Sequence, residues 1–222
     1  MTLIDQLIKQ WNIKCIIFDL DGTIIDTLNK HIRAFEILFK EIKIDIPTLR
    51  IEENMGRTPK DTLLTLISTL EDDKERLENL VNRKEEILTT LLTDIPILDG
   101  TVDLLEFLKS KNLKLCLASS TPKFNVTKML KDTDLLRFFT TVITCEDIII
   151  GKPDPEVFLK AAKKANFDIS HCLIIGDSTH DIEAAKRGNI KIVAVTTGKH
   201  NYEEIKSVHP DYIIKSLNEL LH

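Results

Sequence analysis

The sequence predicts an α/β fold, a doubly wound (Rossmann-like) parallel sheet with an α-helical cap inserted after the first strand. Short apolar runs without polar alternation recur along the 222 residues, and such runs are typical of strands buried on both faces of a parallel sheet. Helix-like stretches separate most of the runs, which is the strand–helix alternation of doubly wound sheets. One long interval has helical periodicity and no convincing strand, and it predicts the insertion.

The expected strands are rich in Ile, Val, Leu and Cys. They are Lys14–Phe18, Leu113–Ala118, Thr141–Thr144, Cys172–Ile175, Ile190–Val195 and, shorter, Tyr212–Ile214. Apolar residues at helical spacing predict helices before the second, fourth and fifth strands, over Val102–Leu108, Val157–Ala165 and Ile182–Lys186. The N-terminal stretch is too polar for the core of a signal peptide and predicts a short amphipathic helix.

The interval between the first two strands is about 90 residues long, whereas a parallel crossover needs only about a dozen. Apolar residues follow a helical period over Leu28–Ile42, Leu63–Leu70 and Leu77–Leu91, so three or four helices can bury their apolar stripes against one another. We therefore expect an α/β core of residues 1–25 and 96–222 and a helical cap of residues 26–95. A cap entered and left through two adjacent chain crossings suits a hinged lid.

The composition is that of an ordinary globular protein, with 43% hydrophobic and 29% charged residues. The net charge of −5 argues against a nucleic-acid partner, because such domains usually carry a basic patch. No apolar run approaches the roughly 18 residues that span a bilayer, which argues against a membrane partner. The four cysteines lack CxxC spacing, so we expect buried reduced thiols and a cytoplasmic protein.

Polar side chains follow four of the expected strands, and parallel strands present their carboxyl ends at one edge of the sheet, where ligands bind. The four segments are Asp19–Thr23, Ser119–Thr121, Gly151–Pro153 and Gly176–Ser178, the last followed by Asp181. Each alone also fits a turn or a helix N-cap. It is much less probable that all four segments at this edge are only turns or caps than that they form one shared site.

Charge counting at this edge points to a cation. Asp19, Asp21, Asp177 and Asp181 oppose a single Lys152, and neighbouring carboxylates repel one another unless a cation or a proton intervenes. All-oxygen ligands suit Mg²⁺, which keeps water positions for a substrate phosphate. A proton held on one of the carboxyl groups would supply a general acid.

The four segments also resemble a known family. The stretches FDLDGTIIDT, LASST, GKPDPEVFLKAA and IGDSTHDIEAA resemble, in order, the four signature motifs of the haloacid dehalogenase superfamily, over Lys14 to about Gly198. The Asp-x-Asp-Gly-Thr form is similar to that of the phosphatases and phosphomutases rather than the dehalogenases. The helical cap resembles that of the subgroup containing phosphoglycolate phosphatase and β-phosphoglucomutase.

The resemblance implies catalytic roles for four residues. Asp19 is the expected nucleophile, forming an aspartyl-phosphate. Asp21 is the expected general acid and base, and it is expected to keep a proton to give to the leaving oxygen. Ser119 is expected to hydrogen-bond a phosphoryl oxygen, and Lys152 to neutralise Asp19 and the transferring group.

The same resemblance implies a metal site and a set of substrate contacts. Mg²⁺ is expected on the Asp19 carboxylate, the Asp21 backbone carbonyl and Asp177, with Asp181 in support. The expected substrate-binding residues are Gly22, Thr23, Ser120 and Arg57.

In the helical cap, the Gly/Pro turn Asn54–Lys60 is the best candidate for leaving-group contacts. Arg57 in this turn would reach a second anionic group of the substrate, or be solvated. His31 lies near the hinge or is an ordinary packed histidine. Lys60 is the nearest candidate for the Schiff-base lysine of phosphonate-cleaving relatives, and we do not favour that role.

These inferences predict a Mg²⁺-dependent phosphatase, a phosphoric monoester hydrolase acting on a small phosphorylated metabolite of the phosphoglycolate or sugar phosphate type. The first alternative is a β-phosphoglucomutase-like phosphomutase, although Gly176-Asp177 is less similar to the Glu-Asp pair common in those enzymes. The second is a module that binds phosphate or Mg²⁺ without turnover. Monomer and homodimer both stay open.

Overall fold

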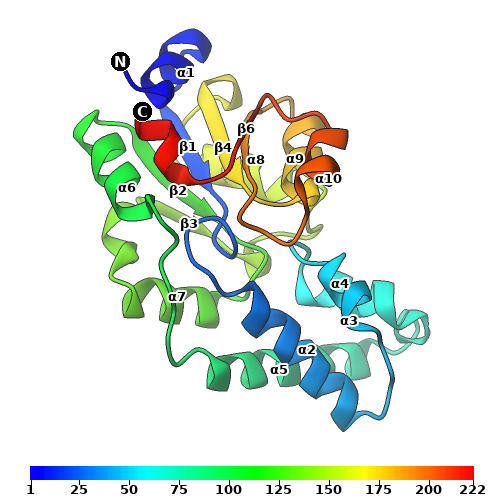
Figure 1. The fold of residues 1–222 in the computed structure, drawn as a ribbon. Coiled ribbons are helices and arrows are strands. Elements are labelled where there is room, and N and C mark those ends of the chain that lie inside the picture. The colour runs from blue at the N-terminus through cyan, green and yellow to red at the C-terminus, as the bar shows by residue number, and fades with distance from the viewer.

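A computed structural model describes residues 1–222, and it has a six-stranded parallel sheet with helices on both faces (Figure 1). The strand order is β3-β2-β1-β4-β5-β6. The strands are β1 (Cys15–Phe18), β2 (Lys114–Ala118), β3 (Thr141–Ile143), β4 (Cys172–Gly176), β5 (Lys191–Val195) and β6 (Tyr212–Ile214). All six predicted strands are present within one residue of their expected ends, and the predicted α/β fold is confirmed.

The sheet separates two apolar cores because successive strand residues point to opposite faces. Ile16 and Phe18 of β1 join the larger core, and Cys15 and Ile17 join the smaller one. The larger core includes α1 (Leu3–Trp11), α6 (Thr101–Ser110) and α7 (Lys123–Asp132), and it continues into the helices inserted after β1. Those of the smaller core are α8 (Glu156–Lys164), α9 (Thr179–Arg187) and α10 (Tyr202–Ser207). Burial on both faces explains why the strands lack polar alternation.

Three of the four cysteines lie on the adjacent strands β2, β1 and β4 and face the smaller core. Cys15, Cys116 and Cys172 are fully buried, and all four cysteines are free thiols. The Sγ atoms of Cys15 and Cys116 are 3.6 Å apart. The expectation of buried reduced thiols is therefore confirmed for these three.

Four α-helices fill the interval between β1 and α6, where the sequence predicted three or four. They are α2 (Leu28–Glu41), α3 (Thr48–Glu52), α4 (Pro59–Leu66) and α5 (Lys74–Leu91). The long helices α2 and α5 pack on each other beyond the edge of the sheet (Figure 1). We keep the name helical cap for residues 26–95, whose boundaries stay a prediction.

The chain enters and leaves the helical cap through two neighbouring backbone segments. The amide of Asp26 donates to the carbonyl of Pro96 over 2.8 Å, and that of Leu98 donates to Ile24 over 3.1 Å. The expected pair of adjacent crossings is therefore present. None of the helices combines the length and the hydropathy needed to cross a lipid bilayer.

Candidate active site

The carboxyl ends of β1 and β4 and the loop before α8 bring a buried lysine between two aspartates. Lys152 Nζ donates to Asp19 Oδ1 over 2.5 Å and lies 2.7 Å from Asp181 Oδ1. It also donates to the carbonyl of Ala118 over 3.4 Å. Burial alone would lower the pKa of Lys152, but Asp181 and Asp19 outweigh it and raise the pKa. Lys152 is therefore a buried cation held between Asp19 and Asp181.

Three carboxylates converge at this point. Asp19, Asp177 and Asp181 are buried, and one oxygen of each lies within 4.8 Å of the others. Burial and the neighbouring carboxylates raise the pKa of Asp19 to about 7, against the opposing effect of Lys152. Burial, Asp19 and Asp181 together raise the pKa of Asp177 well above its ordinary value. Three carboxylates and one lysine leave an excess of negative charge.

This cluster fits a hard divalent cation, because its donors are all carboxylate oxygens and their charge is only partly neutralised. Asp19 and Asp177 would hold Mg²⁺. Asp181 is less available, since Oδ1 faces Lys152 and Oδ2 accepts from the Ser178 hydroxyl over 2.5 Å and the Ser178 amide over 3.1 Å. These hydrogen bonds between Ser178 and Asp181 form the capping box at the start of α9. They agree with a role of Asp181 beside the metal ligands rather than among them.

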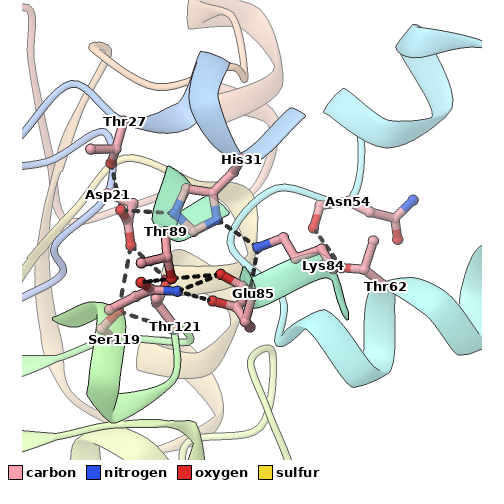
Figure 2. Close-up of polar contacts among 11 residues, drawn as sticks. Asp21, Thr27, His31, Asn54, Thr62, Lys84, Glu85, Thr89, Ser119 and Thr121 are labelled. Carbon is pink, nitrogen blue, oxygen red and sulfur yellow. Dashed lines mark hydrogen bonds and ion pairs between the residues drawn. The ribbon is translucent and has the colours of Figure 1, made fainter. Parts of the chain in front are cut away.

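The Asp21 carboxylate lies outside this cluster, although Asp21 is only two residues from Asp19. Oδ1 accepts from Thr27 Oγ1 over 2.5 Å and contacts His31 Nε2 at 3.1 Å. Oδ2 accepts from Thr121 Oγ1 over 2.9 Å and from Ser119 Oγ over 3.5 Å. Figure 2 shows these donors surrounding the carboxylate. Any contact of Asp21 with a metal would therefore be through its backbone carbonyl, as the resemblance implies.

These donors overturn one expectation from the sequence, that Asp21 keeps a proton in the resting site. Burial alone would raise the pKa of Asp21, but His31 and the hydroxyls of Thr27 and Thr121 outweigh it and lower the pKa to about 2. The carboxylate is thus ionised in this arrangement. The hydroxyl donors lie 6 and 100 residues away in the chain, so counting charges along the sequence did not reveal them.

His31 makes a second buried contact, with Lys84, which the sequence did not predict. Lys84 Nζ on α5 lies 3.1 Å from His31 Nδ1, and its side chain is 0% exposed. An ammonium group has no acceptor capacity, so Nδ1 of His31 accepts and Nε2 carries the proton donated to Asp21. His31, left open from the sequence, therefore contacts the expected acid and base. A lysine between Leu80 and Leu88 on the apolar stripe of α5 was the signal available.

The other expected residues of the first two segments are also placed. Thr23 Oγ1 donates to Asp177 Oδ1 over 2.8 Å, and the amide of Thr121 donates to Ser119 Oγ over 3.1 Å. Gly22 has φ +88°, and a Cβ there would lie 2.6 Å from Asp177 Oδ2. Glycine is thus required by both the backbone conformation and the close approach. Ser120 lines the same small cavity as Asp19 and Asp21, and its hydroxyl donates to the carbonyl of Gly56 in the helical cap over 2.7 Å.

The cap turn Asn54–Lys60 reaches the core through Arg57, whose Nε donates to His180 Nε2 over 2.8 Å. Burial and Arg57 lower the pKa of His180 to about 3, which keeps this imidazole neutral. Arg57 also lines a cavity of about 30 Å³ beside Asp19 and Asp21. Lys60 instead lines a separate cleft of about 640 Å³ between α4, α5 and the loop before α8, so the two residues do not share a site.

The sequence also matches a family model and several named relatives. Residues 16–195 match the model of the haloacid dehalogenase-like hydrolases. A pyrophosphatase of Oceanobacillus iheyensis is 32% identical over 210 residues, covering 95% of this chain and 96% of the relative. A phosphorylated carbohydrates phosphatase of Thermotoga maritima is 30% identical, covering 94% of this chain and 100% of the relative. A β-phosphoglucomutase of Bacillus subtilis is also 30% identical, covering 84% of each chain.

The family match spans most of the chain, and its ends enclose all four polar segments of the site. The phosphatase relatives align over nearly their full lengths. The chain therefore belongs to the haloacid dehalogenase-like hydrolases and is an enzyme of the phosphoric monoester hydrolase type.

Proposed function

We propose that this protein is a Mg²⁺-dependent phosphatase that hydrolyses a small phosphorylated metabolite through an aspartyl-phosphate on Asp19. One observation carries the proposal: Asp19 is held by Lys152 at 2.5 Å inside a cluster of three buried carboxylates, with the Asp21 carboxylate on a separate set of donors. A nucleophile and an acid–base group with separate environments are what a two-step transfer requires. The buried free thiols also support a cytoplasmic location.

Asp19 would attack phosphorus in line with the leaving oxygen. Lys152 would keep Asp19 oriented and neutralise charge on the phosphoryl oxygens, while the Ser119 hydroxyl would donate to them. Mg²⁺, held by Asp19, Asp177 and the Asp21 backbone carbonyl, would offset the negative charge of the phosphoryl group when bound.

Asp21 would act as acid on the leaving oxygen and then as base on the water that cleaves the aspartyl-phosphate. Its ionised state in the resting site suits the second step directly. For the first step, the negative charge of an arriving phosphate would raise the pKa of Asp21 and favour a proton on it. His31 holds the carboxylate in place through Nε2 during both steps.

The cavity beside Asp21 supports a small leaving group. It has a volume of about 30 Å³ and is lined by Leu28, Phe35 and Met55 of the helical cap, with Arg57 and Lys84 as cations. A leaving group with a second anionic centre would find compensating charge there. Of the two expected types, this favours phosphoglycolate, because the leaving group of a sugar monophosphate is neutral. Ser120 would act indirectly by holding the cap turn.

A panel of phosphate esters with Mg²⁺ tests the proposal. Phosphate release that disappears in Asp19→Asn is expected for at least one compact ester. No release above that variant on any ester would contradict turnover and favour the phosphate- or Mg²⁺-binding module. Conversion of β-glucose 1-phosphate to glucose 6-phosphate without net release would favour the phosphomutase, whose relative is as similar as one of the phosphatases.

A further inference from the structure

Asn125 on α7 is a buried amide for which the proposed chemistry has no use. It is 1% exposed, and it lies four residues after Thr121, which donates to Asp21. Its side chain is directed out of the core to helix α5 of the helical cap. Nδ2 donates to Glu85 Oε2 over 2.6 Å and to the Glu85 carbonyl over 3.2 Å, and Oδ1 accepts from Thr89 Oγ1 over 2.8 Å. The amide is thus satisfied entirely by the cap helix.

The other oxygen of Glu85 holds the lysine that contacts His31. Glu85 Oε1 lies 2.7 Å from Lys84 Nζ, and the two side chains are 12% and 0% exposed. A buried ammonium group is costly unless it is paired and hydrogen-bonded. Glu85 is the carboxylate next to this ammonium group, and Asn125 fixes the orientation of Glu85. Figure 2 shows Asp21, His31 and Lys84 following one another, with Glu85 below Lys84.

These contacts form a closed ring that crosses between the helical cap and the core twice. One crossing is His31 to Asp21, and the other is Glu85 to Asn125. The ring closes through the start of α7 and Thr121, which returns to Asp21. Because α2 and α5 pack on each other, a displacement of α5 from α7 would move the Lys84–His31 pair away from Asp21 and loosen the donors on its carboxylate.

We propose that Glu85 and Asn125 form a docking point between the helical cap and the core that positions the Lys84–His31 pair on Asp21. The inference rests on the proposed role of Asp21 as acid and base. Glu85 and Asn125 do not touch Asp21, so they are positioning residues. Their effect is expected to follow the demand of the reaction for a proton.

Asn125→Asp tests this with almost no change in shape, because it sets a carboxylate against Glu85. The double variant Glu85→Gln/Asn125→Asp exchanges donor and acceptor and restores both the hydrogen bond and the net charge. Asn79→Asp, on the exposed face of α5, is the charge-matched control. We expect kcat/KM for an alkyl phosphate to fall about tenfold or more in Asn125→Asp and to stay unchanged in the control. It should recover in part in the double variant, which restores the hydrogen bond to residue 125 but not the carboxylate beside Lys84.

The leaving group separates positioning from general packing. The value of kcat/KM reports steps through phosphoryl transfer, and the phenolate of p-nitrophenyl phosphate leaves without needing a proton. Asn125→Asp should therefore affect p-nitrophenyl phosphate several-fold less than the alkyl phosphate. Equal losses on both esters, or no recovery in the double variant, would overturn the inference.

Small-angle X-ray scattering tests the docking point without relying on turnover. The radius of gyration should increase in Asn125→Asp relative to Asn79→Asp and return in the double variant. If Asn125→Asp does not fold, Glu85→Gln alone is the second test, because its amide oxygen keeps an acceptor for Asn125. This variant should lower turnover of the alkyl phosphate at an unchanged radius of gyration. Unchanged turnover would contradict the inference. Persistence of activity in Asp19→Asn would instead refute the proposed function, while scattering still decides the docking point.

Discussion

The ammonium group of Lys152 lies 2.5 Å from the carboxylate of Asp19, and both side chains are buried. This pair joins the loop before α8 to the end of β1, and Asp181 completes it from α9 at 2.7 Å. Because the pair is surrounded by further carboxylates, Lys152 contributes to stability as well as to the proposed chemistry.

Replacing this lysine should therefore destabilise the protein and stop phosphate release. Lys152→Met leaves Asp19, Asp177 and Asp181 without a nearby cation, and losing one partner of a buried ion pair costs about 3–5 kcal/mol. Urea unfolding without Mg²⁺ should show this loss, and saturating Mg²⁺ should reduce it. Lys163→Met on the exposed side of α8 is the control. An equal effect of the two substitutions would contradict the role of the buried pair.

The raised pKa of Asp19 predicts how the stability of the metal-free protein depends on pH. Its pKa in the folded protein is about 7 against an ordinary value of 3.8, so the folded state binds more protons than the unfolded state between these values. The free energy of unfolding should therefore fall as pH rises from about 4 to about 7. Asp177 acts in the same direction. Asp21, with a pKa of about 2, instead contributes stability above about pH 4 that is lost toward pH 2.

Above pH 7, Mg²⁺ should restore most of the free energy of unfolding that is lost between about pH 4 and about pH 7, because it binds the ionised carboxylates of the folded state. At 100 times its dissociation constant, a ligand of the folded state adds about 2.7 kcal/mol. Denaturant unfolding at pH 5 and pH 8, with and without Mg²⁺, measures both effects. A Mg²⁺ effect of the same size at both pH values would show that the titrating carboxylates are not the ligands.

The fold was predictable because its main signals are local. Strands buried on both faces read as continuous apolar runs, and the long interval without strands indicated the inserted helices. The residues around Asp19 were predictable because parallel strands end at a common edge. The surroundings of Asp21 were not, since they depend on how the cap helices approach the core. Lys84 and Asn125 come from separate helices, and no local spacing relates them to Asp21.

The contact of His31 with Asp21 predicts that replacing His31 lowers turnover, and that the loss is smaller when the new side chain can still donate to Asp21. His31→Leu removes the Nε2 donor and leaves Lys84 without an acceptor on that side. We expect kcat to fall by about 10², with a smaller change in KM. His31→Gln keeps a donor within reach of Asp21 and should retain more activity. Steady-state kinetics on the best ester checks this, and equal losses in the two variants would count against donation to Asp21.

The close contact of the cap turn Asn54–Lys60 with the core predicts an effect of this turn on substrate binding. Gly56 has φ +96°, and a Cβ there would lie 2.7 Å from the Ser178 hydroxyl. Gly56→Ala should therefore displace the turn, break the bond from Ser120 to the Gly56 carbonyl, and hold the helical cap away from the core.

We expect Gly56→Ala to raise KM about tenfold, and the strained conformation to reduce the free energy of unfolding by about 1–3 kcal/mol. Ser120→Ala removes the same hydrogen bond without a clash, so its KM should rise less and its stability should hardly change. Kinetics and urea unfolding of both variants separate the two effects. A Gly56→Ala enzyme with the KM of the natural sequence would show that closure of this turn does not contribute to substrate binding.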